Sequence, residues 1–533
     1  MAGKAFFQHQ SAIRTWMIAV TLFLAFLVLY LSSLSNNYSP DGMSFAVMTT
    51  RGPENTRLFF QAEHLLYPAV PWLWYQMWSL FGYTEGALRP LQVLNAIFGA
   101  GGIALFFIFL RRIFDEKAGA GLLSILGALA LGLSYGYWFH STEAENQIIS
   151  ITFVIAALLV LTRVRRGQSS PLTFAGLAFV AGLAVLFHAT AVLFLPSLLL
   201  GLLPESRARR ASLMLCIGLM SLMVVPLLVI GITAYNYHSR ADFWHWIFAA
   251  QAKGVWGNLQ VDNLAEAARA AATAVLYSGH FPNLTGSDEA SALAPAGSIL
   301  TGVILVGALS VLGYIIYRWP RFRRERWTVV ALVWLVPTVV FNIYWAPEDI
   351  QFWIAAFVAM VVLTGLVWSD LLDRCTSWRR PLQGLAVMAV IVLLFGNFFG
   401  AMHPRSDLET NVGYAEVICL QGKTSESDLI ITPGWDWPSG YLPYFARREV
   451  LSLADAYLLE AQGDSDGLTL VLQQRLSETR DRGGRVFAVR LFDMDKEKRD
   501  WYIEAVGFDP GGLELEHRPA GECLGRTFWE ILS

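Results

Sequence analysis

Carboxylates stand at three places where long apolar stretches of the chain end. Asp41 follows the first stretch, within the motif Ser-Pro-Asp-Gly. Glu143 and Glu145 follow a later stretch, and Glu348 and Asp349 lie in a short turn between two more. A single carboxylate there has an ordinary explanation, because polar loop ends need water. Ionisable side chains near membrane depth are also functional candidates, and the first two sites can converge on one cavity if they share a side.

The composition is that of a membrane protein. Of the 533 residues, 55% are hydrophobic and 15% are charged, whereas soluble domains carry about 25% charged residues. The mean hydropathy is +0.47. Apolar runs of about twenty residues recur along the chain, and such a run crosses a hydrocarbon layer of about 30 Å. The sequence contains no glycine-rich phosphate loop, CxxC motif or HExxH motif.

About eleven membrane spans are predicted, which makes residues 1–400 an all-α polytopic module. The first apolar run is too long for the core of a signal peptide, so we interpret it as an uncleaved span. With the N-terminus inside, the basic clusters all fall on the inner side, including Arg111, Arg112 and the run 318–326. The predicted spans cover about residues 16–34, 88–110, 118–139, 147–162, 171–187, 189–203, 211–235, 295–317, 327–345, 351–370 and 382–400.

Two long loops are predicted on the outer side, at residues 35–88 and 236–294. The part of the first loop at 64–81 is apolar enough to be mistaken for a span. It contains Pro68 and Pro71, and counting it as a crossing would put every later basic cluster on the wrong side. We therefore interpret it as an amphipathic segment that lies in the outer membrane interface.

Residues 401–533 are predicted to form a separate extracytoplasmic α/β domain. The charge density rises there, and short strand-like runs at 428–432 and 485–490 alternate with helical stretches. Two of the four cysteines, Cys419 and Cys523, fall within it. Outside the cytosol such a pair is free to oxidise, so the sequence leaves open a disulfide and two buried thiols.

The first loop and its flanks resemble the membrane glycosyltransferases of superfamily C (GT-C). A proline-containing turn at 67–71 leads into an aromatic amphipathic helix, a Phe-Gly pair and a span that opens with Leu-Arg at 88–89. This order is similar to that of the protein O-mannosyltransferases and the lipid A aminoarabinose transferases, over about residues 15–200. The latter enzymes usually have Lys-Pro-Pro where this chain has other residues at 66–69, so the basic group is absent or relocated to His64.

The resemblance implies an inverting enzyme with a polyprenyl-phosphate sugar as donor. Its acceptor would be a hydroxyl of a protein, lipid or glycan at the outer membrane face. These families carry an Asp soon after the first span, matched by Asp41, and an acidic residue after the third, matched best by Glu145 and secondarily by Glu143. A carboxylate that takes the hydroxyl proton accelerates such a reaction by typically about 10²–10⁴-fold. That is the role implied for Asp41.

The leaving phosphate of such a donor needs positive charge or a metal nearby. The turn that holds Glu348 is rich in aromatic residues and would line the donor cavity or form part of an interfacial belt. Glu145 would orient a basic group or hold a divalent cation, with Mn²⁺ or Zn²⁺ suited to a carboxylate and a His and Mg²⁺ to oxygen ligands alone. Whether a metal binds is open. The basic candidates are Arg51, Arg57 and His64 in the first loop, His140 in the second, and His188 between two spans.

Two other classes of protein fit parts of the pattern. A transporter or flippase for a lipid-linked sugar would show related halves with broken helices and charges in mid-span, whereas this chain has no internal repeat and carries its charges at span ends. A non-catalytic scaffold that acts through its external domain is the other alternative. The lack of a long Ser- or Gln-rich tract favours a bacterial protein, and thus the inner membrane. The basic clusters place the N-terminus in the cytoplasm. Membrane lipids are expected partners and nucleic acids are not.

Overall fold

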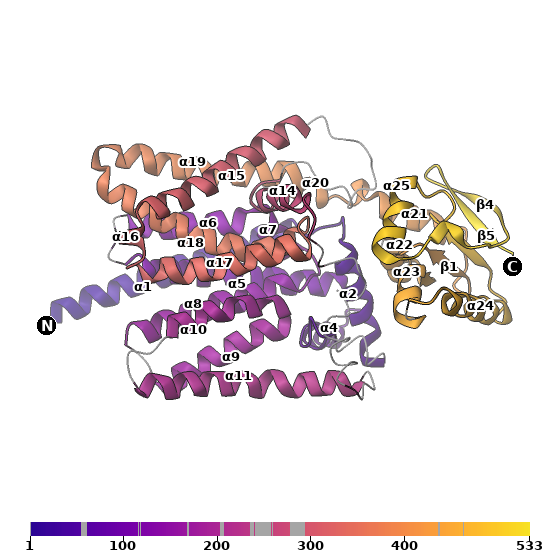
Figure 1. Cartoon of the computed structure of the whole chain (residues 1–533), viewed down its shortest axis with the longest axis horizontal. Helices are drawn as coiled ribbons and strands as arrows, with labels where there is room; N and C mark the ends of the chain where they lie inside the picture. Colours follow the sequence, from indigo (N-terminus) through magenta and orange to yellow (C-terminus); the bar gives the residue numbers. More distant parts are fainter. Residues whose placement is uncertain are drawn as a thin grey trace.

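The computed structural model contains an elongated bundle of helices with a smaller α/β domain at one end (Figure 1). Arg57 and most of the predicted loop at 236–294 lie outside the residues that the structure describes. The described residues are 2–532 apart from 55–60, 116, 118, 168–169, 203–206, 235–238, 240–256, 258, 278–293, 435–436 and 462.

Within the described part of the chain, eight helices are long and apolar enough to cross a membrane. A ninth candidate is the pair α6 (Ala120–Leu133) and α7 (Tyr135–Thr142), which bends by 59° at the break. The other two predicted spans are shorter apolar helices, α9 (Pro171–Phe187) and the η2–α10 segment (Ala189–Leu202). The eight long helices are α1 (Ala2–Ser32), α5 (Leu88–Ile113), α8 (Gln147–Arg165), α11 (Arg207–Ala234), α15 (Ala294–Tyr317), α17 (Arg326–Trp345), α18 (Ile350–Arg374) and α19 (Arg379–Asn397).

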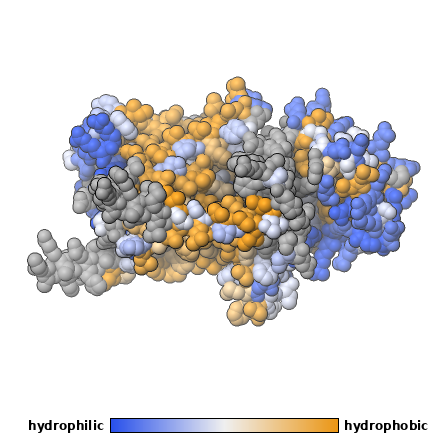
Figure 2. Space-filling view, turned by 60° about the horizontal axis from the view of Figure 1, so that its bottom comes forward, coloured by the Kyte–Doolittle hydropathy of each residue, from blue (hydrophilic) through white to orange (hydrophobic). Residues whose placement is uncertain are grey.

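The surface of the bundle is apolar along its length. Figure 2 shows hydrophobic residues over the middle of the bundle and hydrophilic residues over the C-terminal domain and the opposite tip. Large side chains such as Val28, Leu222, Val303 and Ile316 are more than 60% exposed on it. An apolar surface of this extent is stable only against lipid or a partner. The chain is an integral multi-pass membrane protein.

The first outer loop folds into two helices at the bundle end nearest the C-terminal domain (Figure 1). They are α2 (Pro40–Arg51), which is followed by the short η1 (Gly52–Glu54), and α4 (Ala69–Leu80). The 12 residues of α4 extend about 18 Å, too little to cross a membrane. Leu80 and Phe81 at its end are 85% and 89% exposed. These features agree with the predicted interfacial segment.

The C-terminal domain contains a five-stranded sheet in the order β2-β1-β3-β5-β4. Strands β1 (Leu429–Thr432), β2 (Glu449–Ser452) and β3 (Val486–Val489) are parallel, whereas β4 (His517–Cys523) and β5 (Arg526–Ile531) form an antiparallel hairpin beside β3. The predicted strands at 428–432 and 485–490 are β1 and β3. The helices are α21 (Val412–Gln421), α22 (Trp437–Tyr441), α23 (Leu453–Asp455), α24 (Ser465–Asp481) and α25 (Lys496–Trp501).

A shared hydrophobic cluster joins the two parts of the molecule. Met43 and Phe45 of α2 belong to the same cluster as Tyr441 and Phe487 of the C-terminal domain. The backbones approach closely there, since a Cβ atom added at Gly440 would lie 2.9 Å from the Cβ of Met43. The domain therefore packs directly on the helix that begins with Pro40 and Asp41.

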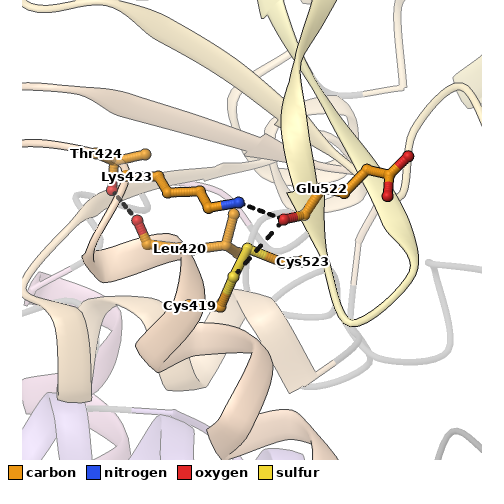
Figure 3. The surroundings of a disulfide bond; sticks show 6 residues. All are labelled: Cys419, Leu420, Lys423, Thr424, Glu522 and Cys523. Atoms are coloured by element: carbon orange, nitrogen blue, oxygen red, sulfur yellow. Dashed lines mark hydrogen bonds between the residues drawn. A yellow bond between two sulfur atoms is a disulfide. The ribbon is translucent and has the colours of Figure 1, made fainter.

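Cys419 of α21 and Cys523 of β4 form a disulfide, with their Cα atoms 5.8 Å apart (Figure 3). Lys423 donates a hydrogen bond from Nζ to the backbone carbonyl of Glu522 beside it. The disulfide ties α21, which follows the last span, to β4 at the edge of the sheet. Cys216 and Cys375 are free cysteines.

We expect the disulfide to stabilise the C-terminal domain by about 2–5 kcal/mol, because it closes a loop of more than a hundred residues in the unfolded chain. The double variant Cys419→Ser/Cys523→Ser should therefore melt at a lower temperature. Mass spectrometry after thiol alkylation, with and without prior reduction, checks the bond itself. The matched control is Cys375→Ser, and equal melting of the two variants would contradict the expectation.

Candidate active site

Asp41 lies in the first turn of α2, with its side chain exposed. Ser39 caps this helix, because its Oγ accepts a hydrogen bond from the backbone N–H of Gly42 at 3.0 Å. Pro40 occupies the first helical position, which suits its fixed φ and missing N–H group. The motif Ser-Pro-Asp-Gly is thus a helix start, where a carboxylate interacts favourably with the helix dipole.

The loops that follow the first and third predicted spans meet beside Asp41. The backbone N–H of Ser39 donates to Oε2 of Glu143 at 3.4 Å. The hydroxyl of Tyr67 donates to the carbonyl of Ala144 at 3.1 Å. The backbone N–H of Ser35 donates to the carbonyl of Thr142 at 3.3 Å. The structure therefore brings together the two acidic sites that follow the first and third predicted spans.

Glu143 is fully buried and forms an ion pair with Arg405. Nη2 of Arg405 lies 2.7 Å from Oε1 of Glu143, and their side chains are 11% and 0% exposed. Nη2 also donates to the carbonyl of Asn37 and lies 3.4 Å from Oγ of Ser35. Arg405 ends the short helix α20 (His403–Arg405), which leads from the last span into the C-terminal domain. One cation thus connects the first loop, the second loop and the domain.

Glu145 forms a second buried pair with His140. Oε2 of Glu145 lies 2.7 Å from Nδ1 of His140, and the side chains are 6% and 2% exposed. Burial raises the pKa of Glu145, but the charge of His140 and the hydrogen bond to it outweigh burial and hold this pKa below its usual value. Nε2 of His140 has no hydrogen-bond partner among the described residues.

The Glu145–His140 pair has the form of a metal-binding histidine with a carboxylate behind it. In the part of the chain that the structure describes, however, no group of three or more His, Cys, Asp or Glu side chains is arranged to hold a metal ion. The described residues thus supply one nitrogen and one carboxylate for a cation, and we assign no step to one.

His64 and His188 lie together next to this pair, with ring centroids 4.8 Å apart. Nδ1 of His64 lies 2.8 Å from Nδ2 of Asn146. Burial lowers the pKa of His64 to about 4, so its ring is uncharged at neutral pH. The backbone N–H of Thr190 donates to Nδ1 of His188 at 3.2 Å, and Nε2 of the same ring lies 2.7 Å from the side-chain amide nitrogen of Gln147. Both histidines are therefore held by groups of the second loop and the helix junctions that flank it.

The other predicted donor-site residues are spread more widely. Arg51 is exposed in the last turn of α2, about 15 Å along the helix axis from Asp41. Glu348 is exposed as well, whereas its neighbour Asp349 is half-buried and caps α18 by accepting the N–H of Gln351 at 3.0 Å. Burial and, to a lesser degree, the charge of Glu145 raise the pKa of Asp349 to about 6. Of the two acids in this turn, Asp349 interacts with Glu145.

A small cavity of about 20 Å³, enough for about one water molecule, lies between α8, η2, α17 and α18, below the second loop. Polar side chains line the end near the loops, and Gln147 at this end contacts His188. Aromatic and aliphatic side chains, including Phe194, Trp334 and Phe352, line the rest.

Comparisons with known proteins agree with this arrangement. Residues 67–231 match the sequence profile of the family described as dolichyl-phosphate-mannose-protein mannosyltransferase. No curated protein sequence matches the chain significantly.

Solved structures of two enzymes have a similar fold. ArnT from Cupriavidus metallidurans bound to undecaprenyl phosphate is 14% identical and superposes with a TM-score of 0.58 over 96% of this chain and 97% of that one. Its apo state gives a TM-score of 0.56. The Archaeoglobus fulgidus oligosaccharyltransferase in complex with Zn and sulfate is 12% identical and gives a TM-score of 0.52 over 93% of this chain and 70% of that one.

These matches define the fold of the chain. The chain has the fold of the GT-C membrane glycosyltransferases, with a C-terminal α/β domain after the helical module. Its helical module also carries the match to the mannosyltransferase family, within residues 67–231.

The sequence named Asp349 as a candidate beside Glu348 but assigned only Glu348 to the donor site, because nothing local distinguishes the two neighbours. Arg405 was missed. Arg405 did leave a signal, since it lies just beyond the last span on the predicted outer side, where the positive-inside rule does not favour a basic residue.

We expect Arg405→Met to lower the free energy of unfolding by about 3–5 kcal/mol, because it leaves the Glu143 carboxylate buried without a partner. Thermal unfolding of the purified protein in detergent measures the change. The matched control is Arg518→Met, which removes an equally short 2.7 Å pair with Glu530 whose arginine is 62% exposed, and should cost about 1 kcal/mol or less. Equal losses of unfolding free energy in the two variants would show that burial does not make the Glu143–Arg405 pair more important for stability than an exposed pair.

Asp349 should make the protein less stable as the pH rises from about 4 to 7. Its pKa of about 6 in the folded protein lies above the value of about 3.9 for an unfolded chain. The folded state therefore binds the proton more tightly, and stability is lost as the carboxyl ionises. In Asp349→Asn, the melting temperature relative to wild type should rise over this range, whereas Glu409→Gln, at an exposed site, should show a constant difference. A constant difference for Asp349→Asn would refute the assignment.

Proposed function

We propose that the protein is an inverting glycosyltransferase. It moves a sugar from a polyprenyl-phosphate donor to an acceptor hydroxyl of a protein, lipid or glycan at the outer membrane face. The observation that carries the proposal is the exposed Asp41 carboxylate at the start of α2. The N–H of Ser39, just before it, donates to the buried Glu143, and the whole chain has a GT-C fold. Asp41 is exposed to an incoming acceptor, whereas the carboxylates of Glu143 and Glu145 are buried in ion pairs.

In this mechanism Asp41 accepts the proton of the acceptor hydroxyl while its oxygen attacks the anomeric carbon. The bond between that carbon and the phosphate oxygen breaks on the opposite face, which inverts the anomeric centre. The phosphate leaves with its polyprenyl chain and both electrons of the broken bond. Developing charge on the phosphate needs preorganised donors or cations.

We assign the donor phosphate to the side of the site formed by the Glu145–His140 pair. Nε2 of His140 is a buried nitrogen without a described partner there, and Glu145 pairs with Nδ1 of the same ring. The uncharged ring of His64 lies close by and is held by Asn146. Arg51 and Glu348 lie at the exposed rim, where they would act on the approach of substrates.

We assign the polyprenyl chain to the region between α8, α17 and α18, beginning beside His188 and continuing along Phe194 and Trp334. The similar ArnT structure contains undecaprenyl phosphate, which supports a donor lipid of this chemical class.

We propose a bacterial inner membrane as the location, with the N-terminus in the cytoplasm. The basic segment α16 (Trp319–Phe322) lies at the bundle end opposite the C-terminal domain (Figure 1). The positive-inside rule then puts that end in the cytoplasm and Asp41 outside.

We expect Asp41→Asn to lower sugar transfer at least about 100-fold, because Asn cannot take the proton. The assay uses purified protein in vesicles, a panel of radiolabelled undecaprenyl-phosphate sugars and a membrane extract of the source organism as acceptor. Binding of undecaprenyl phosphate should be unchanged. Glu85→Gln, an exposed acid of the same loop, is the control and should transfer normally.

Near-normal turnover by Asp41→Asn would refute the assignment of the base. If the wild-type protein moves the donor across the vesicle membrane without transferring the sugar, the protein is a flippase. If it does neither with any donor of the panel, a scaffold role is favoured.

A further inference from the structure

The hydroxyl of Tyr441 bonds to both backbone groups of Tyr38. It accepts a hydrogen bond from the Tyr38 N–H at 3.0 Å and donates one to the Tyr38 carbonyl at 2.9 Å. The side-chain amide of Asn411 donates to the same oxygen at 3.2 Å. Tyr441 is 3% exposed and belongs to α22 of the C-terminal domain. The hydroxyl of Tyr441, 403 positions away in the sequence, thus makes the hydrogen bonds that the Tyr38 backbone would otherwise make within a helix or a sheet.

Tyr38 lies directly before the cap of α2. Ser39 caps the helix and Asp41 lies in its first turn. The backbone at Tyr38 therefore determines where the helix begins and how its first turn is oriented. The rings of Tyr38 and Tyr441 also pack together, with centroids 5.9 Å apart.

The C-terminal domain and its linker contact the preceding residues as well. Asn411 donates to the carbonyl of Asn36 at 2.6 Å, and Asn37 donates to the hydroxyl of Thr410 at 2.7 Å. The carbonyl of Arg405 accepts the N–H groups of Asn36 and Asn37 at 2.7 and 3.1 Å. Residues 36–38 thus depend mainly on the domain and its linker for their polar contacts.

We propose that Tyr441 is a positioning residue for Asp41, so that the C-terminal domain completes the active site of the membrane module. The inference rests on the proposed role of Asp41 as the base. Tyr441 touches neither the substrate nor the reacting atoms in this proposal, and it acts through the backbone of Tyr38. Displacement of a base by about 1 Å can reduce a rate about 100-fold.

The test compares Tyr441→Phe with Tyr457→Phe in the full-length protein. Tyr457 lies in the same domain and is also buried, but its hydroxyl donates to the carbonyl of Gly507 at 3.2 Å, within the domain. Turnover is measured with an undecaprenyl-phosphate sugar that the wild-type protein uses. We expect Tyr441→Phe to lower kcat about 10- to 100-fold, with the donor KM and the melting temperature similar to those of Tyr457→Phe.

Two further measurements separate positioning from general damage. Hydrogen exchange should be faster at the Tyr38 amide in Tyr441→Phe, and unchanged there in Tyr457→Phe. In the Asp41→Asn background, Tyr441→Phe should cause no further loss of turnover, because the group that it positions is already gone.

The outcomes distinguish this inference from the function on which it rests. If Asp41→Asn is inactive and Tyr441→Phe turns over like Tyr457→Phe, Asp41 remains the base and the positioning role is refuted. Equal fractional losses from Tyr441→Phe in both backgrounds would also refute it. If Asp41→Asn retains normal turnover, the base assignment fails and the positioning role fails with it.

Discussion

The carboxylate of Glu143 and the guanidinium of Arg405 meet in the interior between the helical bundle and the C-terminal domain. Removing either charge from water costs several kcal/mol, so neither is stable there without the other. The pair also determines the course of the chain, because Arg405 bonds to Asn37 and Ser35 while Glu143 accepts the N–H of Ser39. These ion-pair and hydrogen-bond contacts fix three segments relative to one another. The segments are the start of α2, the second loop and the linker to the domain.

Burial separates the acidic residues of the site into two roles. Glu143 and Glu145 are enclosed with Arg405 and His140, so each carboxylate has a partner within the protein. Asp41 is exposed at a helix start that tolerates a negative charge. We therefore interpret the enclosed carboxylates as the electrostatic frame of the site and Asp41 as the group available to a substrate. The neutral His64 and His188 extend this frame toward the cavity in the bundle.

The C-terminal domain is more than an appended module in this arrangement. It packs on α2 through Tyr441 and Gly440, and its disulfide ties α21 to the edge of the sheet. The proposed function joins a membrane-bound donor to an acceptor outside the membrane, and such a reaction needs a site at the boundary. The structure places α2, which begins with Pro40 and Asp41, between the bundle and the domain (Figure 1).

The sequence by itself determined the membrane class, the apolar helices, the amphipathic nature of α4 and the main strands of the domain. These follow from hydropathy and local patterning, which a single sequence records. It also singled out Asp41 and Glu145 by their places after the first and third predicted spans. Only the tertiary structure joined Glu143 to Arg405, 262 positions away, and favoured Asp349 over Glu348. Such pairs depend on how distant segments pack, and no local pattern of residues encodes that distance.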